Sequence, residues 1–400
     1  MANAKPPQAR PETPTELRES AGRPSIIVLG ASARACAAST MRSGFTPHAC
    51  DLFGDADLRA QAVFHGVVEP YPIGFENSLR TMPEAPFVYT GGLENHPELV
   101  DRLSRIRPLW GNSGFILRAA RDPVALAEAM HGAGASPPET RRGNDPPRNP
   151  EGWLQKPLRG AGGNGIQPVA RALPKAGRSA HKVYFQRHCP GLSCSAVYAA
   201  LGERCDLLGA TRQLIGEEWL GAQPFAWCGN VGPLTFEASV QRTLEACGRN
   251  AMRSFGLLGL FGIDFLLDGA VVQPVEINPR YPASTEVLEL ALGLSAMRLQ
   301  AQAFGHEVKP TEPLRPRPGV VGKAIIFATR TGRARGSNAM EVLDSSGILP
   351  AVADIPLSGS ILRKGSPVCT VLAQGEDEAD CLQSLRAQQL RVLRLLGPGI

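Results

Sequence analysis

The sequence predicts an α/β protein built from a doubly wound parallel sheet, a larger central α/β domain and a small β-rich module at the C-terminal end. Three observations lead to this fold class. Short apolar runs alternate with helical segments over residues 25–118, strand-like runs dominate from residue 153, and Pro/Gly-rich stretches at residues 135–152 and 315–321 separate these regions. A chain of 400 residues can enclose two or three ordinary cores.

The N-terminal region begins with a strand, a turn and a helix. Residues 25–29 are a β-branched run that turns at Gly30, and the Ala-rich segment that follows has helical propensity and ends near Gly44. Further strands are expected within residues 47–58 and 86–95, and a helix at residues 96–106. Because strands that alternate with helices form parallel sheets, we expect a parallel sheet here.

The central and C-terminal regions are richer in strands. Residues 262–280 form two strands joined by a tight turn. The other expected strands cover residues 153–158, 181–189, 194–202, 322–330 and 365–375, and the expected helices cover residues 124–134, 240–254, 284–305 and 380–396.

Composition excludes several classes of protein. The 42 basic and 37 acidic residues are spread along the chain without a dense Lys/Arg run, so we expect no nucleic-acid partner. The longest apolar run, residues 255–267, is too short to cross a bilayer, so we expect no membrane span. Nine cysteines without paired spacing indicate reduced thiols and a cytoplasmic location. The polar, Pro-rich residues 1–24 are expected to be a disordered tail.

The hairpin at residues 262–280 carries the first chemical signal. If residues 268–270 form a three-residue connection, Asp264 pairs with Pro274, and Glu276 lies diagonally beside Asp264 on the same face. Asn278 falls on that face as well. A two-residue turn would instead place Asp264 and Glu276 on opposite faces.

Two carboxylates and one amide offer only oxygen ligands, which favour Mg²⁺ (or Mn²⁺) over zinc. Arg280, two residues beyond Asn278, could hold a phosphoryl group with two parallel hydrogen bonds. The alternative is a surface hairpin whose acidic pair is accidental and is capped by a salt bridge.

A Gly-rich loop preceded by a lysine is the second signal. The loop glycines are Gly160, Gly162, Gly163 and Gly165, with Asn164 between the last two. Glycines let the backbone approach an anion and point amide groups at it, and Lys156 adds a positive charge at the end of a strand. No Gly-Lys-Ser/Thr follows, so this is not a Walker loop. A flexible hairpin tip is the alternative.

Residues 183–196 form a third, weaker signal. A strand runs into a Pro-Gly turn there, and Gln186 with the backbone of Arg187 to Cys189 could hydrogen-bond a planar base. Residues 30–34 depart from the Gly-x-Gly-x-x-Gly fingerprint, so a nicotinamide dehydrogenase is not expected.

These segments, taken in their order along the chain, resemble the ATP-grasp superfamily. The motifs are LQKPLRGAGGNGI, QRHCPGLS, GIDFLLDG and VEINPR, within residues 119–309. The NPR ending is similar to the carboxylase, carbamoyl-phosphate and tyramine-glutamate ligase branches. The resemblance implies a pre-ATP-grasp Rossmann-like domain at residues 25–118, an ATP-grasp domain at residues 119–309 and a C-terminal β-rich domain at residues 310–400.

The resemblance also implies a role for each motif residue. Lys156 would contact the nucleotide phosphates under the loop from Gly160 to Gly165, and Arg280 would steady the transferred phosphoryl group. The base and sugar would be held by Gln186, Arg187, Cys189 and Ser193. The Mg²⁺ ligands would be Asp264, Glu276 and Asn278.

Two positions depart from the family pattern. A lysine that the family often places at the start of the helix before the Gly-rich loop is Pro123 here, with Arg121 as a candidate substitute. The position that often holds a ribose-binding glutamate is Ser193. Both departures bear on nucleotide affinity.

The resemblance implies an ATP- and Mg²⁺-dependent ligase that activates a small-molecule carboxylate as an acyl phosphate for attack by an amine. A narrower expectation is ligation of an amino acid such as glutamate in cofactor biosynthesis. Two rivals stay open: a biotin-carboxylase-like enzyme that activates bicarbonate, and an ATP-binding sensor or scaffold without turnover. The sequence does not identify the carboxylate, the amine or the role of the C-terminal module, and a homodimer is among the assemblies that it leaves open.

Overall fold

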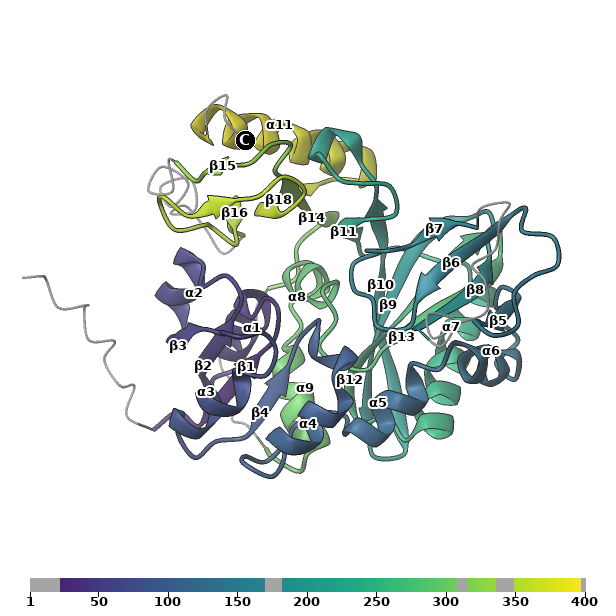
Figure 1. The fold of residues 1–400 in the computed structure, drawn as a ribbon, viewed down its shortest axis with the longest axis horizontal. Helices are drawn as coiled ribbons and strands as arrows, with labels where there is room; N and C mark the ends of the chain where they lie inside the picture. The colour runs from purple at the N-terminus through teal and green to yellow at the C-terminus, as the bar shows by residue number, and fades with distance from the viewer. Residues whose placement is uncertain (1–21, 170–181, 308–314, 336–348, 397–400) are drawn as a thin grey trace, which may run out of the picture.

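The computed structural model describes residues 22–169, 182–307, 315–335 and 349–396 (Figure 1). The predicted disordered tail falls almost wholly on residues outside these ranges. Mixed sheets and helices are present, as the predicted α/β class requires.

The N-terminal region is a four-stranded parallel sheet. Its strand order is β3-β2-β1-β4, and every neighbouring pair is parallel, which confirms the predicted parallel sheet. The strands are β1 (Ser25–Leu29), β2 (Thr46–Asp51), β3 (Val63–Val67) and β4 (Phe87–Tyr89). Strand β3 was not among the expected elements.

Helices cover both faces of this sheet because its central strand is apolar on both sides. Ile26 and Val28 pack with Cys36 of α1, whereas Ile27 and Leu29 pack with residues of α3 and α4 on the other face. The helices of this region are α1 (Arg34–Arg42), α2 (Ala56–Gln61), α3 (Phe75–Thr81), the short η1 (Leu93–Asn95) and α4 (Pro97–Leu103).

The centre of the molecule is an eight-stranded sheet with a smaller four-stranded sheet beside it (Figure 1). The large sheet has the order β13-β12-β9-β10-β11-β14-β18-β16, and the small one has the order β5-β8-β6-β7. The central strands of the large sheet are β9 (Leu192–Leu201), β10 (Arg204–Ile215), β11 (Trp227–Gly232), β12 (Gly259–Asp268) and β13 (Val271–Asn278). The small sheet contains β5 (Thr140–Arg142), β6 (Trp153–Pro157), β7 (Gln167–Pro168) and β8 (Val183–Arg187).

One side of the large sheet is covered by α7 (Ala238–Phe255) and α6 (Pro123–His131), which follow the short helix α5 (Gly114–Ala120). Val240, Leu244 and Cys247 of α7 are buried against strand residues such as Tyr198 and Phe261. The amphipathic pattern of this helix agrees with the prediction for residues 240–254.

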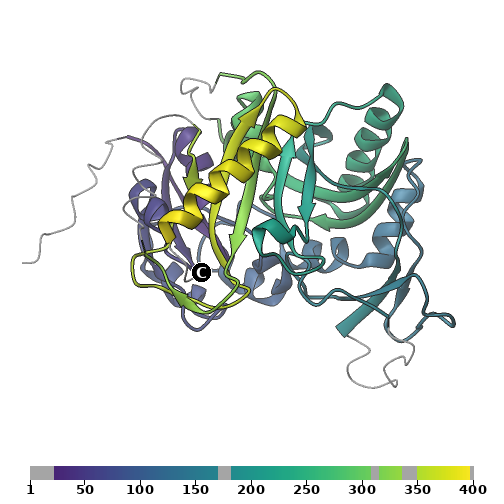
Figure 2. The same cartoon turned by 90° about the horizontal axis from the view of Figure 1, so that it is seen from above.

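The C-terminal strands continue the same large sheet. These strands are β14 (Val320–Phe327), β18 (Pro367–Gly375) and β16 (Val352–Ala353), while β15 (Gly332–Arg333) and β17 (Ile361–Leu362) form a separate pair. Helix α11 (Glu378–Leu396) lies across β14 and β18 (Figure 2) and buries Cys381, Leu385 and Val392 against them. The module boundary at residue 310 stays a prediction.

The long helix predicted at residues 284–305 is two helices, α8 (Thr285–Leu292) and α9 (Ala296–Ala303). Gly293 ends α8 in the left-handed conformation, with φ of 71°. The buried Glu289 side chain then accepts a hydrogen bond from the Ala296 amide, 2.8 Å away, at the start of α9. The apolar periodicity continues through this break, which is why the sequence predicted one helix.

The nine cysteines are all free thiols, in agreement with the absence of a predicted disulfide framework. In the described part of the chain, no helix combines the length and the apolar character that a membrane crossing needs.

Candidate functional site

The hairpin of β12 and β13 brings the predicted acidic pair together by a different register from the expected one. The turn contains two residues, Gly269 and Ala270, so the predicted three-residue connection and the pairing of Asp264 with Pro274 are wrong. A β-bulge after Asp264 inserts one extra residue into β13, and Asp264 therefore lies directly opposite Glu276. Residues directly opposite in an antiparallel pair share a face. A two-residue turn without a bulge would place Asp264 and Glu276 on opposite faces, and the bulge returns them to the same face.

Three side chains of this hairpin and its end form a chain of polar contacts that reaches Glu94. The amide of Asn278 donates to Asp264 Oδ2 over 3.0 Å, and Arg280 Nη2 donates to Asn278 Oδ1 over 3.0 Å. Arg280 Nε also donates to Glu94 of η1, 3.1 Å away. Asn278 and Glu94 are buried, whereas 41% of the Glu276 side chain is exposed.

The electrostatics of the carboxylate pair fit a cation. Burial, with the neighbouring charge of Glu276, raises the pKa of Asp264 to about 6. A bound divalent cation would relieve this repulsion, and oxygen donors are the ligands that Mg²⁺ takes. Among the described residues no group of three or more His, Cys, Asp or Glu side chains is arranged for a metal, so the donor set would be two carboxylates and one amide.

A cavity lies beside this pair, under the Gly-rich loop. Glu276 forms part of one wall and Lys156 with Tyr184 form another. The predicted loop residues that line the cavity are Gly160, Gly162, Gly163 and Asn164. Glu276, Lys156 and the Gly-rich loop therefore meet at one hollow, whereas Asp264 is not among the described residues that line it.

The loop is folded down onto β11. The Trp227 amide donates to the Gly162 carbonyl over 3.0 Å, and Gly163, with φ of 79°, lies against the backbone of Phe225. A Cβ atom on Gly163 would come within 1.8 Å of the Phe225 carbonyl oxygen, so only glycine permits this contact. The loop in this conformation forms part of the cavity lining.

The residues predicted to hold a base are engaged elsewhere or lie outside the cavity lining. Lys156 Nζ donates to Gln186 Oε1 over 2.6 Å, and the Gln186 amide donates to Thr140. The Arg187 side chain donates to the Glu151 carbonyl and its backbone amide to Glu139. The predicted site residues that are not among the described residues lining the cavity are Gly165, Gln186, Arg187, Cys189, Ser193, Asp264, Asn278 and Arg280.

The N-terminal region contributes side chains that the sequence did not reveal. Besides Glu94, the Asn95 amide donates to the Gly160 carbonyl over 3.1 Å. Arg121, which lies beyond that region and is already the candidate substitute for the family lysine, donates to Glu276 Oε1 over 2.8 Å. The only sequence signal was the pair of glycines before Leu93, because a loop at the end of a parallel strand is a usual place for a site.

Residues 120–284 match the family model described as the ATP-grasp domain. The chain contains an ATP-grasp domain. The match includes the Gly-rich loop, the hairpin and Arg280, and the fold agrees with the resemblance stated from the motifs.

A curated relative is an uncharacterised protein of Methanocaldococcus jannaschii, 29% identical over 124 residues. The match spans 31% of this chain and 28% of that protein, so the chain covers well under half the length of this relative.

Solved structures with an ATP-grasp fold are similar over nearly the whole chain. N5-carboxyaminoimidazole ribonucleotide synthetase from Thermus thermophilus is 15% identical with a TM-score of 0.62, over 93% of this chain and 98% of that one. An L-amino acid ligase from Bacillus licheniformis is 13% identical with a TM-score of 0.64, over 92% and 97%. The biotin carboxylase domain of 2-oxoglutarate carboxylase from Hydrogenobacter thermophilus, with MgADP and bicarbonate, is 13% identical with a TM-score of 0.64, over 90% and 89%.

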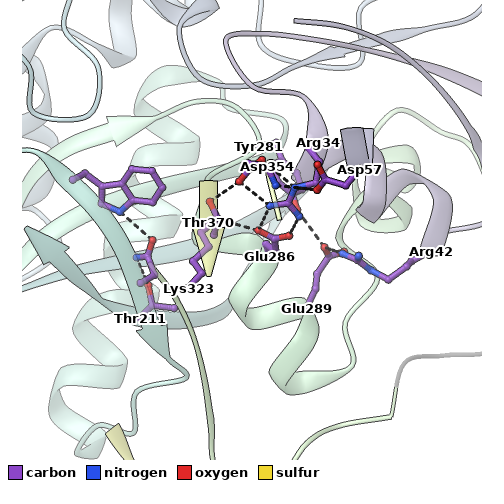
Figure 3. Close-up of polar contacts among 12 residues, drawn as sticks. Arg34, Arg42, Asp57, Thr211, Tyr281, Glu286, Glu289, Lys323, Asp354 and Thr370 are labelled. Atoms are coloured by element: carbon purple, nitrogen blue, oxygen red, sulfur yellow. Dashed lines mark hydrogen bonds and ion pairs between the residues drawn. The ribbon is translucent and has the colours of Figure 1, made fainter. Parts of the chain in front are cut away.

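A buried charged network borders the ATP-grasp domain, where α8 follows the hairpin (Figure 3). Glu286 of α8 accepts hydrogen bonds from Arg34 of α1 and from Lys323 of β14. Arg34 also donates to Asp354, which in turn accepts from Thr370. The network joins the N-terminal sheet, the helix after the hairpin and the C-terminal strands.

Proposed function

We propose that this protein is an ATP- and Mg²⁺-dependent ligase that activates a small-molecule carboxylate as an acyl phosphate and joins it to an amine. The observation that carries the proposal is the Asp264 and Glu276 pair, placed face to face beside a cavity that Lys156 and the Gly-rich loop enclose. The ATP-grasp domain supports it, and the similar structures include an amino-acid ligase.

The nucleotide phosphates would lie in the cavity. Lys156 offsets their charge as a point cation, and the loop amides between Gly160 and Asn164 face them from above. Asp264, Glu276 and Asn278 would hold Mg²⁺ (or Mn²⁺), which would supply positive charge for the phosphate oxygens. The exposed fraction of Glu276 gives a cation access from solvent.

The chemistry needs an activated acyl group because a carboxylate oxygen does not leave readily. The substrate carboxylate attacks the terminal phosphorus of ATP, ADP leaves, and an acyl phosphate forms. The amine then attacks the carbonyl carbon, phosphate leaves with the former carboxylate oxygen, and the amine loses a proton. Arg280 steadies the transferred phosphoryl group with its guanidinium, and the closed Gly-rich loop keeps water from the acyl phosphate.

The narrower proposal is that the amine is an amino acid such as glutamate, in the synthesis of a cofactor. This rests on the likeness of the NPR ending to tyramine-glutamate ligases. We further propose a cytoplasmic enzyme with small-molecule partners only.

The experiment that tests the proposal is ADP release from Mg·ATP by purified protein, wild type beside Glu276→Gln. Pooled amino acids, amines and small carboxylates are supplied, and the products are identified by mass spectrometry. We expect stimulated ADP release by the wild type and none by the variant, since the variant lacks one metal-binding charge. The Glu276 side chain is partly exposed, so the variant should keep its fold, which circular dichroism checks.

Two further outcomes distinguish the rival functions. ADP release that depends on bicarbonate, without an amide product, would indicate a carboxylase-like enzyme, as in the similar structure with bound bicarbonate. Nucleotide binding without ADP release from any pool would indicate a non-catalytic ATP-binding protein.

A further inference from the structure

Arg121 joins three separate segments around the cavity. Its Nη1 donates to Glu276 Oε1 over 2.8 Å, and its Nη2 donates to Asn95 Oδ1 over 3.2 Å and to the Gly160 carbonyl over 3.3 Å. Arg121 directly follows α5, and 11% of its side chain is exposed. The same side chain also lines the cavity.

The contact with Glu276 is incompatible with full use of that carboxylate by a metal ion. A cation bound to Glu276 would lie close to the guanidinium, which stays positively charged at any ordinary pH. The cation and the Arg121 guanidinium would both contact the same carboxylate and would repel each other, because the Arg121 side chain is only 11% exposed and water screens its charge little. Arg121 and Mg²⁺ therefore compete for the same carboxylate.

A guanidinium that loses its partner in a mostly buried site needs another anion. Arg121 lines the cavity in which the nucleotide phosphates would lie, and a guanidinium binds phosphate oxygens with two parallel hydrogen bonds.

We propose that Arg121 is an exchangeable phosphate-binding residue. Without nucleotide it neutralises Glu276 and holds the first glycine of the loop. When Mg²⁺ takes Glu276, Arg121 turns to the nucleotide phosphates, and Asn95 alone keeps its hydrogen bond to Gly160. This inference rests on the proposed function, because it assigns a role in binding the same nucleotide.

The test measures two affinities separately, neither of which requires turnover. Binding of Mn²⁺ alone is followed by the electron paramagnetic resonance of free Mn²⁺, and binding of a non-hydrolysable ATP analogue with Mg²⁺ is followed by calorimetry. Arg121→Ala should bind Mn²⁺ more tightly and the analogue more weakly, each by about tenfold, the size expected for one charge-assisted hydrogen bond. Arg118→Ala is the matched control, because Arg118 lies in α5, three residues before Arg121, and pairs with Asp101 on the surface.

The reciprocal variant removes the carboxylate with which Arg121 pairs. Glu276→Gln should bind the analogue without metal severalfold more tightly than the wild type does, because Arg121 is then free for phosphate. Arg121→Lys should recover part of the analogue affinity, since it restores the charge without the two-pronged geometry.

The outcomes separate the two proposals. If the wild type binds the analogue and Arg121→Ala binds it equally well, the role of Arg121 is refuted while the proposed function stands. If Arg121→Ala weakens both affinities, Arg121 only positions Glu276, and the exchange is refuted. If the wild type binds no analogue at all, the proposed function fails and the inference fails with it.

Discussion

Arg34 of α1 and Glu286 of α8 form a buried ion pair in which both guanidinium Nη atoms donate to the two carboxylate oxygens. The bond from Nη2 to Oε2 measures 3.1 Å, and both side chains are at most 3% exposed. Lys323 of β14 adds a second cation, 3.2 Å from Oε2. Burial alone would raise the pKa of Glu286, but Arg34 and Lys323 outweigh it and lower the pKa to about 2.

Replacing Glu286 by glutamine should destabilise the whole chain. The change leaves Lys323 without its carboxylate and Arg34 with only its aspartate partners, inside a site that excludes water. Loss of one member of a buried pair costs about 3 to 5 kcal/mol, so we expect a drop of this size in the free energy of unfolding. Urea unfolding followed by circular dichroism measures it.

The control for this variant is Glu245→Gln, whose partner Arg249 lies one turn away on the exposed face of α7. An exposed pair of this kind contributes less than about 1 kcal/mol. Equal effects of the two substitutions would mean that the Arg34 network contributes no more than a surface ion pair.

The buried carboxyl group of Asp55, which lies near Asp354 and Arg34 of this network, should make the free energy of unfolding fall as pH rises. Asp55 is only 6% exposed, makes no capping hydrogen bond, and lies near the carboxylates of Asp354, Asp57 and Asp51. Burial, followed by these neighbours, raises its pKa from 3.8 to about 9. The folded protein therefore keeps a proton that the unfolded chain releases above about pH 4, and stability decreases with a slope of at most about 1.4 kcal/mol per pH unit until pH 9.

Asp55→Asn removes this proton linkage and should flatten the decline between pH 5 and pH 9. The measurement is the urea midpoint of the wild type and the variant at each pH, with the exposed Asp145→Asn as the control. Parallel curves for the wild type and Asp55→Asn would show that Asp55 ionises normally in the folded protein.

Local patterns predicted the parts of the structure that depend on neighbouring residues in the sequence. The strand, turn and helix at the N-terminal end and the hairpin at its centre were predicted from apolar periodicity and turn residues. The register of the hairpin was not, because the bulge after Asp264 has no turn residue that marks it in the sequence. The acidic pair was thus predicted correctly from an incorrect register.

Contacts between segments far apart in the chain could not be predicted from the sequence. Glu94 and Arg280 are 186 residues apart, and neither position has a pattern that names the other as its partner. The same holds for Gln186, whose side chain accepts from Lys156 instead of standing free. Burial and tertiary geometry determine which side chains pair in this way, and neither can be inferred from a single sequence.

Asp264→Asn should stabilise the fold while removing the response to metal. At pH 8 the wild-type carboxylate is ionised although its pKa is raised to about 6, so the folded state carries an electrostatic cost that asparagine lacks. We expect the variant to gain about 1 kcal/mol without metal, allowing for partial exposure of the side chain. We expect added Mg²⁺ with nucleotide to raise the melting temperature of the wild type only. A variant that still responds to Mg²⁺ would show that Asp264 is not a metal ligand.

Lys156→Ala should raise the concentration of ATP needed for half-maximal rate more than it raises that of the acceptor. The ammonium group lines the cavity, and burial lowers its pKa although the nearby carboxylates of Glu276 and Asp264 oppose this shift. Its hydrogen-bond partner is the neutral amide oxygen of Gln186. A phosphate would supply the missing negative charge, and one charge-assisted hydrogen bond corresponds to about tenfold in affinity. Lys182→Ala is the control, since that lysine is exposed just before β8. The measurement is initial rate against each substrate in turn, and an effect confined to the acceptor would assign Lys156 to the acceptor site instead.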